Sequence, residues 1–253
     1  MPRRMLEFLE LSSATFWFIA LAAFLTGALH GATGMAGGVT MAAVLSHMVG
    51  IKVAIPVMTC ALIFSHASRV ALYWRDTDLD IAKRVLMFGA PMIVVGALAF
   101  TVLDPKFVAI IFAGVLMLSF PIKYWARNRG IKTGPTLLAA ASSVWGMLAG
   151  NVIGPGFFLA PFLLGTGMSR LTFVGTLATI TLVMNVIKLS VFGVTEFMNL
   201  RLFVLGVLVG VITIPANWLG REILKRMSDS NHALFLDVLT LIMIVNFLYL
   251  ALG

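Results

Sequence analysis

The chain has 253 residues, of which 60% are hydrophobic and only 11% are charged. Soluble domains carry about 25% charged residues, so this composition excludes an ordinary water-soluble protein and favours one that lies in a bilayer. The net charge of +8 does not indicate a nucleic-acid partner, because the basic residues lie between apolar runs, as expected for the loops of a membrane protein.

Eight runs of at least 16 residues contain no Asp, Glu, Lys or Arg, and these runs predict the membrane segments. They are 11–51, 53–68, 85–103, 107–122, 133–169, 171–187, 202–220 and 238–253. A transmembrane helix needs about 20 mostly apolar residues and tolerates charges at its ends, so six of the runs are single spans. The other two are too long for one straight helix. We therefore predict an all-α polytopic membrane protein with about eight transmembrane segments.

The run lengths repeat along the chain. They are 41, 16, 19 and 16 residues, and then 37, 17, 19 and 16. An offset of 119 residues places Gly27 on Gly146 and preserves the spacing of the glycines that follow. An internal duplication accounts for this pattern. We predict two related halves, 1–125 and 136–253, joined by a basic loop at 126–135.

Each half begins with a stretch that is typical of a broken helix. The first is GALHGATGMAGG at 27–38, with five glycines, and the second is GMLAGNVIGPGFFLAP at 146–161, with two prolines. Glycine and proline both weaken a helix. Transporters use such breaks to direct helix N-termini at an anionic ligand. The candidate backbone contacts to a substrate are therefore Gly34, Gly37, Gly38, Gly154 and Gly156.

Some of these glycines have a simpler interpretation. Gly27-x-x-x-Gly31 and Gly146-x-x-x-Gly150 have the spacing of small-residue seams, which let two membrane helices approach closely. We expect such a seam to tolerate one added methyl group better than a binding site tolerates a branched side chain.

Charge alone leaves two topologies open. If each half crosses four times in parallel, the basic residues outside the spans divide 10 inside to 6 outside. If each long block is a hairpin, the halves are inverted, and with the N-terminus outside the division is 11 to 5. Both divisions obey the positive-inside rule.

Two cations lie within predicted spans, at positions that are equivalent under the same offset. They are Arg69 and Lys188, and a hydrogen-bonding residue precedes each by one helical turn, His66 and Asn185. His30 and Asn151 lie in the two glycine-rich stretches. All six are candidate substrate-binding residues, although each cation is close enough to a helix end to extend its head to the membrane surface instead.

Several kinds of chemistry lack the residues that they need. Away from the helix ends, no predicted span before the last carries Asp or Glu, which sodium sites and carboxylate proton relays use. Motifs of metalloproteases, serine hydrolases and phosphate-binding loops are missing, so we predict neither an enzyme nor a metal or cofactor. The net positive charge within the membrane favours a small anion as the transported species.

The sequence resembles the sulfite exporter TauE/SafE family of membrane transporters. The resemblance lies in the glycine-rich stretch at the beginning of each half, in GPGFFLAP of the second half, and in the following MSRLTFVGTLATI. The resemblance covers about residues 14–252. The first half departs from the pattern, because Ala42 stands where the family's proline is expected. The resemblance implies a substrate such as sulfite, sulfoacetate or another small organic anion.

The prediction from the sequence is an ion-gradient-driven transporter, an exporter of a small anion, in the cell (inner) membrane. A proton is the candidate coupling ion, and a homodimer is left open. An anion channel, and a membrane subunit or sensor that transports nothing, are the alternatives. A channel would show only downhill flux, and a subunit would show none in pure liposomes.

Overall fold

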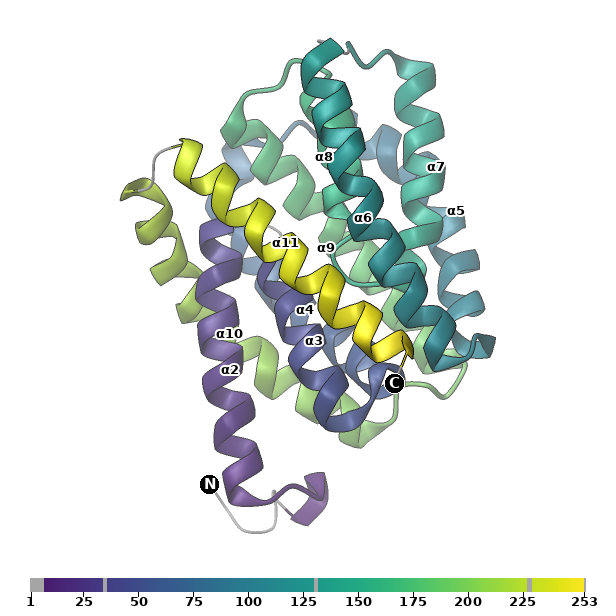
Figure 1. The fold of residues 1–253 in the computed structure, drawn as a ribbon, viewed down its shortest axis with the longest axis vertical. Coiled ribbons are helices and arrows are strands. Elements are labelled where there is room, and N and C mark those ends of the chain that lie inside the picture. Colours follow the sequence, from purple (N-terminus) through teal and green to yellow (C-terminus); the bar gives the residue numbers. More distant parts are fainter. Residues whose placement is uncertain (1–6, 34–35, 130–131, 227–228, 253) are drawn as a thin grey trace.

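The computed structural model describes residues 7–33, 36–129, 132–226 and 229–252. Among these residues the chain is helical and forms no strand. The helices are α2 (Ser13–Thr33), α3 (Ala36–Val49), α4 (Ile51–Tyr73), α5 (Leu79–Val102), α6 (Pro105–Arg129), α7 (Pro135–Asn151), α8 (Gly156–Leu164), α9 (Arg170–Val194), α10 (Leu200–Arg226) and α11 (Asp229–Leu252), with a 3-10 turn η1 at Trp74–Asp76 (Figure 1).

Local sequence explains where several helices begin. Asp78 accepts a hydrogen bond from the Ile81 amide at 2.9 Å at the start of α5, and Ser169 accepts one from the Thr172 amide at 3.2 Å at the start of α9. Side chains of this kind satisfy amide groups that have no partner inside the helix. The interiors of these helices are apolar, so in a bilayer their backbone bonds are all made within the segment.

Five helices are long and apolar enough to cross a membrane, namely α2, α4 with η1, α5, α9 and α10. Shorter apolar helical stretches are Ala36–Val49, Pro105–Ser119 and Asp237–Leu252. Large apolar side chains lie more than half exposed on the outside of the molecule, as a lipid-facing surface requires: Trp17, Leu25, Met87, Val102, Val194, Trp218 and Val245. The predicted multi-pass, all-helical class is confirmed. The predicted count of eight spans stays a prediction, because α7 and α8 have only 17 and 9 residues.

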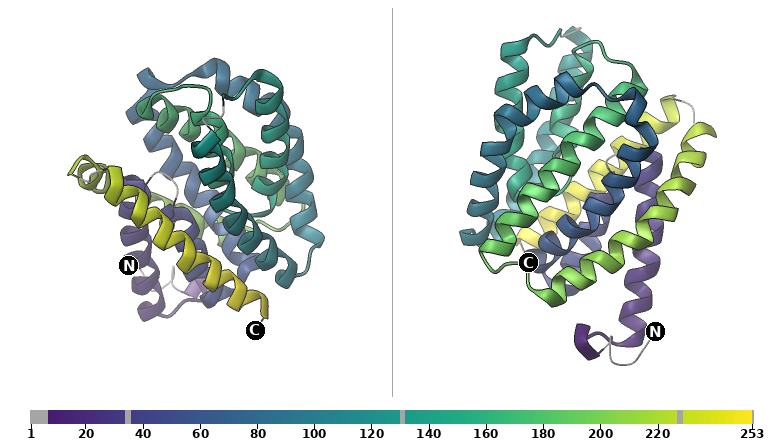
Figure 2. Two further views of the ribbon diagram at one scale, coloured as in Figure 1. Left: turned by 45° about the horizontal axis from the view of Figure 1, so that its top comes forward. Right: turned by 180° about the vertical axis from the view of Figure 1, so that it is seen from behind.

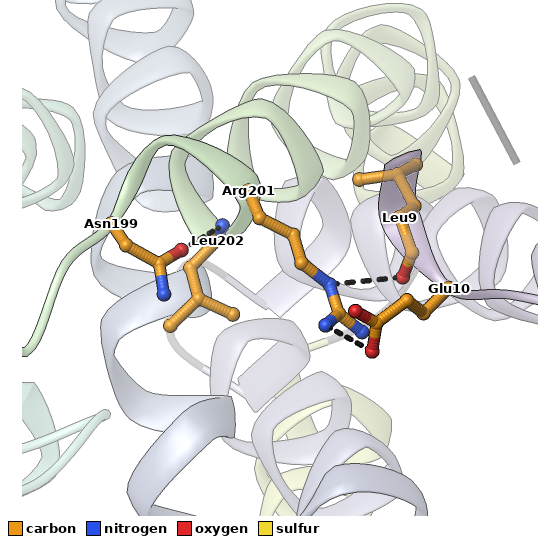
Figure 3. A network of polar contacts seen from close by, with 5 residues as sticks. All are labelled: Leu9, Glu10, Asn199, Arg201 and Leu202. Atoms are coloured by element: carbon orange, nitrogen blue, oxygen red, sulfur yellow. Dashed lines mark hydrogen bonds and ion pairs between the residues drawn. The ribbon is translucent and has the colours of Figure 1, made fainter. Parts of the chain in front are cut away.

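Contacts between helix termini define one end of the molecule, called here the N-terminal end. At the start of α10, Arg201 donates from Nε to the Leu9 carbonyl at 3.0 Å and pairs with Glu10 at 2.5 Å (Figure 3). Beside them, the Asn199 side chain accepts the Leu202 amide at 2.9 Å and caps α10. The starts of α2 and α10 therefore lie together.

Three further contacts place other helix termini at the N-terminal end or at the end opposite. Lys52, at the start of α4, donates to the Phe100 carbonyl at the end of α5. At the opposite end, the Asp78 amide donates to Thr176 at 2.9 Å. There the Thr133 amide also donates to the Gly165 carbonyl at 2.8 Å, which joins the approach to α7 with the exit from α8.

The helices α2 and α3 form one hairpin, and α7 and α8 form another. The hairpins enter the molecule from opposite ends (Figure 1), and the start of α3 meets the turn between α7 and α8 inside it. α2 and α7 thus begin at opposite ends, which is the direction that inverted halves require and parallel halves do not.

Basic residues divide unevenly between the two ends. The opposite end holds Arg75, Lys83, Arg84, Lys123, Arg127, Arg129, Lys132, Arg170, Arg221, Lys225 and Arg226. The N-terminal end holds Lys52, Lys106 and Arg201, and Arg3 and Arg4 precede the described residues. The positive-inside rule predicts that the end rich in positive charge faces the cytoplasm.

Helix pairing crosses between the first and second parts of the chain. α2 packs along α10, and α5 packs along α7. α4 packs against both α9 and α10, as the view from behind shows (Figure 2). α6 and α11 pack on each other across the front (Figure 1). The rings of Phe112 and Phe247 are stacked between them, with their centroids 4.0 Å apart.

Small residues permit the closest of these approaches. A Cβ at Gly27 would lie 2.9 Å from the Ala216 Cβ of α10, and a Cβ at Gly146 would lie 2.3 Å from the Gly89 carbonyl oxygen of α5. The interpretation of these glycines as packing seams is confirmed. At Gly146 the atom in the way is a backbone oxygen, which moves only if α5 moves. That a seam tolerates one methyl group better than a binding site tolerates a branched side chain stays a prediction.

The orientation can be tested by labelling single cysteines in a Cys60→Ala background. Thr136 and Leu200 are both exposed in the first turn of a helix, at the opposite end and at the N-terminal end respectively. With a membrane-impermeant maleimide, we expect Thr136→Cys to react from the cytoplasmic side and Leu200→Cys from the outside. Labelling of both positions from the same side would contradict this arrangement.

The α5–α7 seam can be tested with a matched pair of substitutions. Gly146→Ala should lower the free energy of unfolding by about 1–3 kcal/mol, because the added methyl overpacks the contact. Gly193→Ala in α9, where a Cβ has open space, should be neutral or slightly stabilising. The measurement is thermal unfolding in detergent, and an equal loss in the two variants would refute the seam.

Candidate functional site

The first break separates α2 from α3, and side chains of α2 bond to the backbone there. Thr33 donates to the Leu29 carbonyl at 2.7 Å and accepts the Ala36 amide at 3.1 Å. The Gly38 amide donates to His30 Nδ1 at 3.3 Å. The amide groups at the start of α3 have no partner inside their own helix, so these bonds replace the missing helical ones.

Gly37 has a packing role in the first break, and its predicted contact with a substrate stays a prediction. A Cβ at this position would lie 2.0 Å from the Thr26 carbonyl oxygen and 2.5 Å from the His30 Cβ. Gly37 therefore lets α3 lie directly against α2. Gly34, another predicted contact, lies outside the described residues.

The second break lies between Asn151 and Gly156, where α7 ends and α8 begins. Gly154 has φ +84°, a conformation that favours glycine, and a Cβ there would also collide with Val39. The Phe157 amide donates to the Gly154 carbonyl at 3.3 Å in a turn that starts α8. The predicted break is confirmed at this position.

Lys188 of α9 holds the carbonyl side of the second break. Its Nζ donates to the Ala149 carbonyl at 3.1 Å and to the Val152 carbonyl at 3.0 Å, and the side chain is fully buried. Carbonyl groups at a helix C-terminus carry partial negative charge, which a cation stabilises. Lys188 therefore caps α7 from the neighbouring helix and does not extend to the membrane surface.

The two breaks lie against each other in the middle of the molecule. A Cβ on Gly38, at the start of α3, would lie 3.5 Å from Ile153 in the second break. Gly154 of the second break lies against Val39 of α3. The beginnings of α3 and α8 thus meet, as expected of two discontinuous helices that share one site.

Arg69 and His66 of α4 meet His30 of α2 beside the first break. Arg69 Nη1 lies 3.3 Å from His30 Nε2, and the rings of His30 and His66 lie edge to face at 5.3 Å. The side chains of these three residues are at most 5% exposed. Sequence spacing predicted that His66 and Arg69 share a face of α4, and the structure adds His30 to them.

Asn151, in the glycine-rich stretch of the second half, and Asn185, which corresponds to His66, form side-chain hydrogen bonds within their own helices. Asn151 Nδ2 donates to the Met147 carbonyl at 3.3 Å, and Asn185 Nδ2 donates to the Thr181 carbonyl at 2.8 Å. The Oδ1 atoms of both are buried and have no hydrogen-bond partner among the described residues. Each therefore keeps one acceptor that a donor can use.

A small apolar hollow of about 160 Å³, including the open space at its mouth, adjoins the starts of α3 and α8. Its lining is Ala36, Val39, Leu116, Phe157, Leu239, Thr240 and Met243. The lining comes from α3, α6, α8 and α11, so the hollow lies between the breaks and the α6–α11 pair. Among the described residues, no group of three His, Cys, Asp or Glu is placed to hold a metal ion.

A polar contact that the sequence analysis missed joins α10 to α4. Asn217 donates to Ser65 Oγ at 2.8 Å and to Ser68 Oγ at 3.3 Å. The sequence does contain a sign of this contact, because Asn217 is a polar residue within the otherwise apolar run 202–220. This contact holds α10 next to the turn of α4 that carries His66.

Long apolar helices, two opposed breaks and buried cations beside them define a polytopic membrane transporter. The family model of the sulfite exporter TauE/SafE matches residues 19–247, so the chain belongs to this family. The resemblance inferred from the sequence is confirmed. Neither the curated proteins nor the solved structures give a match. Family membership makes the chain a membrane transporter, and the members of the family are transporters rather than enzymes.

The capping role of Lys188 predicts a stability defect. Lys188→Met keeps the length of the side chain but leaves the Ala149 and Val152 carbonyls without this donor. The loss should be about 1.5–3 kcal/mol, the contribution of a hydrogen bond to a charged group. Lys83→Met, at an exposed position of α5, is the matched control and should change little. Equal melting temperatures of the two variants in detergent would show that Lys188 does not support the break.

Proposed function

We propose that the protein is a secondary transporter that exports a small anion, and that the anion is a sulfur oxyanion or organosulfonate such as sulfite or sulfoacetate. One observation carries the proposal: a buried arginine and two histidines lie at a helix break in the middle of the membrane protein. A charge is expensive inside a bilayer and is kept there chiefly for function.

The distribution of acidic residues supports an anion. The sequence contains no Asp or Glu from residue 11 to 75 or from 105 to 195, and these ranges include both breaks and both buried cations. The charged residues that these two ranges contain are therefore all cations. Family membership agrees, because the family is described by sulfite export.

Two related, inverted halves are part of the proposal. The helix bounds of the two halves correspond under the offset of 119 residues: α4 at 51–73 matches α9 at 170–194, and α5 at 79–102 matches α10 at 200–226. The pairing α2–α10 becomes α7–α5 when the halves are exchanged, and both pairings occur. Such an arrangement lets one half move against the other around a site at their interface.

The proposed transport follows an ion gradient, with a proton as the candidate coupling ion, across the inner membrane of the cell. The end rich in basic residues faces the cytoplasm in this proposal, so the anion enters the protein there and leaves at the N-terminal end. The side chains of the first break are the proposed substrate contacts.

Counterflow in liposomes tests the function. Purified protein is reconstituted into liposomes that are loaded with unlabelled sulfite. Uptake of labelled sulfite into these liposomes is then compared with uptake of sulfoacetate, sulfate and acetate. We expect transient accumulation above equilibrium for a sulfur anion. Arg69→Gln should reduce the rate at low substrate about tenfold or more, through loss of a charge-assisted hydrogen bond.

The same assay separates the alternatives. Lys52→Gln, which removes a cation from the N-terminal end and not from the breaks, is the control and should transport normally. Downhill flux without counterflow would indicate a channel. No flux of any anion in liposomes that contain monodisperse protein would reject transport.

A further inference from the structure

His30 is approached by two hydrogen-bond donors at once. The Gly38 amide donates to Nδ1 at 3.3 Å, and the Arg69 guanidinium lies 3.3 Å from Nε2. A backbone amide and a guanidinium have no acceptor to offer. Both ring nitrogens of His30 therefore face groups that only donate.

An imidazole cannot accept from both sides. The neutral ring has one acceptor nitrogen and one N–H, and the protonated ring has two N–H groups. With Nδ1 accepting the Gly38 amide, Nε2 carries hydrogen and is directed at the Arg69 guanidinium. In this contact the Nε2–H of His30 and an N–H of Arg69 are two donors that point at each other, and both residues are buried.

We propose that one oxyanion binds between Arg69 and His30, accepting hydrogen bonds from the guanidinium and from Nε2–H. This inference rests on the proposed function and names the position and chemical class of its substrate. An acceptor oxygen between the two groups turns the opposed donors into a matched pair. A small shift of the Arg69 side chain, which has several rotatable bonds, makes the room.

The chemistry of the cluster selects an oxyanion over a halide. The planar guanidinium presents parallel N–H groups that match two oxygens of one anion. His66 stands beside His30, and its buried Nδ1 has no hydrogen-bond partner among the described residues. It offers a further polar contact to an anion with three oxygens. A halide, with a single spherical centre, matches the planar fork of the guanidinium less well than two oxygens of one anion do.

The second half does not repeat this site, even though its cation is equivalent in position. Lys188 already donates to two carbonyls of the second break. Using it to bind an anion would remove the cap from α7. The chain therefore binds one anion, at the first break, and Lys188 positions the second break against it.

Entry of the anion requires a movement. His30, His66 and Arg69 are 4%, 5% and 3% exposed, so the anion reaches them only when the α2–α3 hairpin and α4 separate. The hairpin contacts α4 along α3, and the bond between Gly38 and His30 is made within the hairpin. A movement of the hairpin that shifts α2 along α10, on which it packs, therefore keeps this bond.

Equilibrium binding to the purified full-length protein tests the site. Titration calorimetry with sulfite should give one site per chain. Arg69→Gln should weaken sulfite binding about tenfold or more, and Arg69→Lys, which keeps the charge but loses the planar fork, should fall between. His30→Gln should also weaken binding. Lys52→Gln, which lies at the N-terminal end and away from both breaks, should retain the wild-type affinity.

Competition defines the ligand class. Acetate, a carboxylate with two oxygens, should compete with sulfite, and chloride at equal ionic strength should not. Two sites per chain, wild-type affinity in Arg69→Gln, or competition by chloride would overturn the inference while counterflow by the wild-type protein still stands. A wild-type protein that neither binds nor transports any oxyanion would overturn the proposed function as well.

Discussion

Backbone N–H and C=O groups at a helix break inside a bilayer must form hydrogen bonds within the protein, and this requirement determines which side chains surround the two breaks. Each open N–H or C=O in hydrocarbon costs several kcal/mol. At the first break Thr33 and His30 accept amides of α3, and at the second Lys188 donates to carbonyls at the end of α7. Several of the polar side chains buried deep in the membrane are therefore explained first by the breaks that they stabilise.

Satisfying the backbone with side chains couples the breaks to their neighbours. Lys188 belongs to α9, yet it fixes the end of α7, so a shift of either helix alters the second break. The first break is supported from within its own hairpin, by residues of α2. The second break is thus held by a side chain of another helix, and the first by side chains of its own hairpin. The two breaks are therefore similar in sequence but respond differently when neighbouring helices shift.

Sequence patterns predicted those features that local physical chemistry determines. Apolar runs predicted the helices, glycine and proline predicted the second break, and helical spacing placed His66 and Arg69 on one face. The contact of Arg69 with His30 joins residues 39 positions apart and depends on how α3 folds back on α2. The hydrogen-bond partners of Lys188 could not be predicted from the sequence either, since a long side chain can reach either a lipid headgroup or a backbone carbonyl. Gly37 and Gly27 look alike in sequence, and only the packing tells which helix each one faces.

The pairing of α2 with α10 has a consequence for how the protein is made. About 170 residues separate the end of α2 from the start of α10. At roughly 5–20 residues per second, a ribosome needs on the order of 10–30 s to synthesise them. A helix that enters the membrane during synthesis therefore waits through that interval with Gly27 and Gly31, the small residues of its seam, against lipid or a provisional neighbour. The nascent chain completes this contact only near the end of translation, so premature termination in the second half leaves the first helix without its long-range partner.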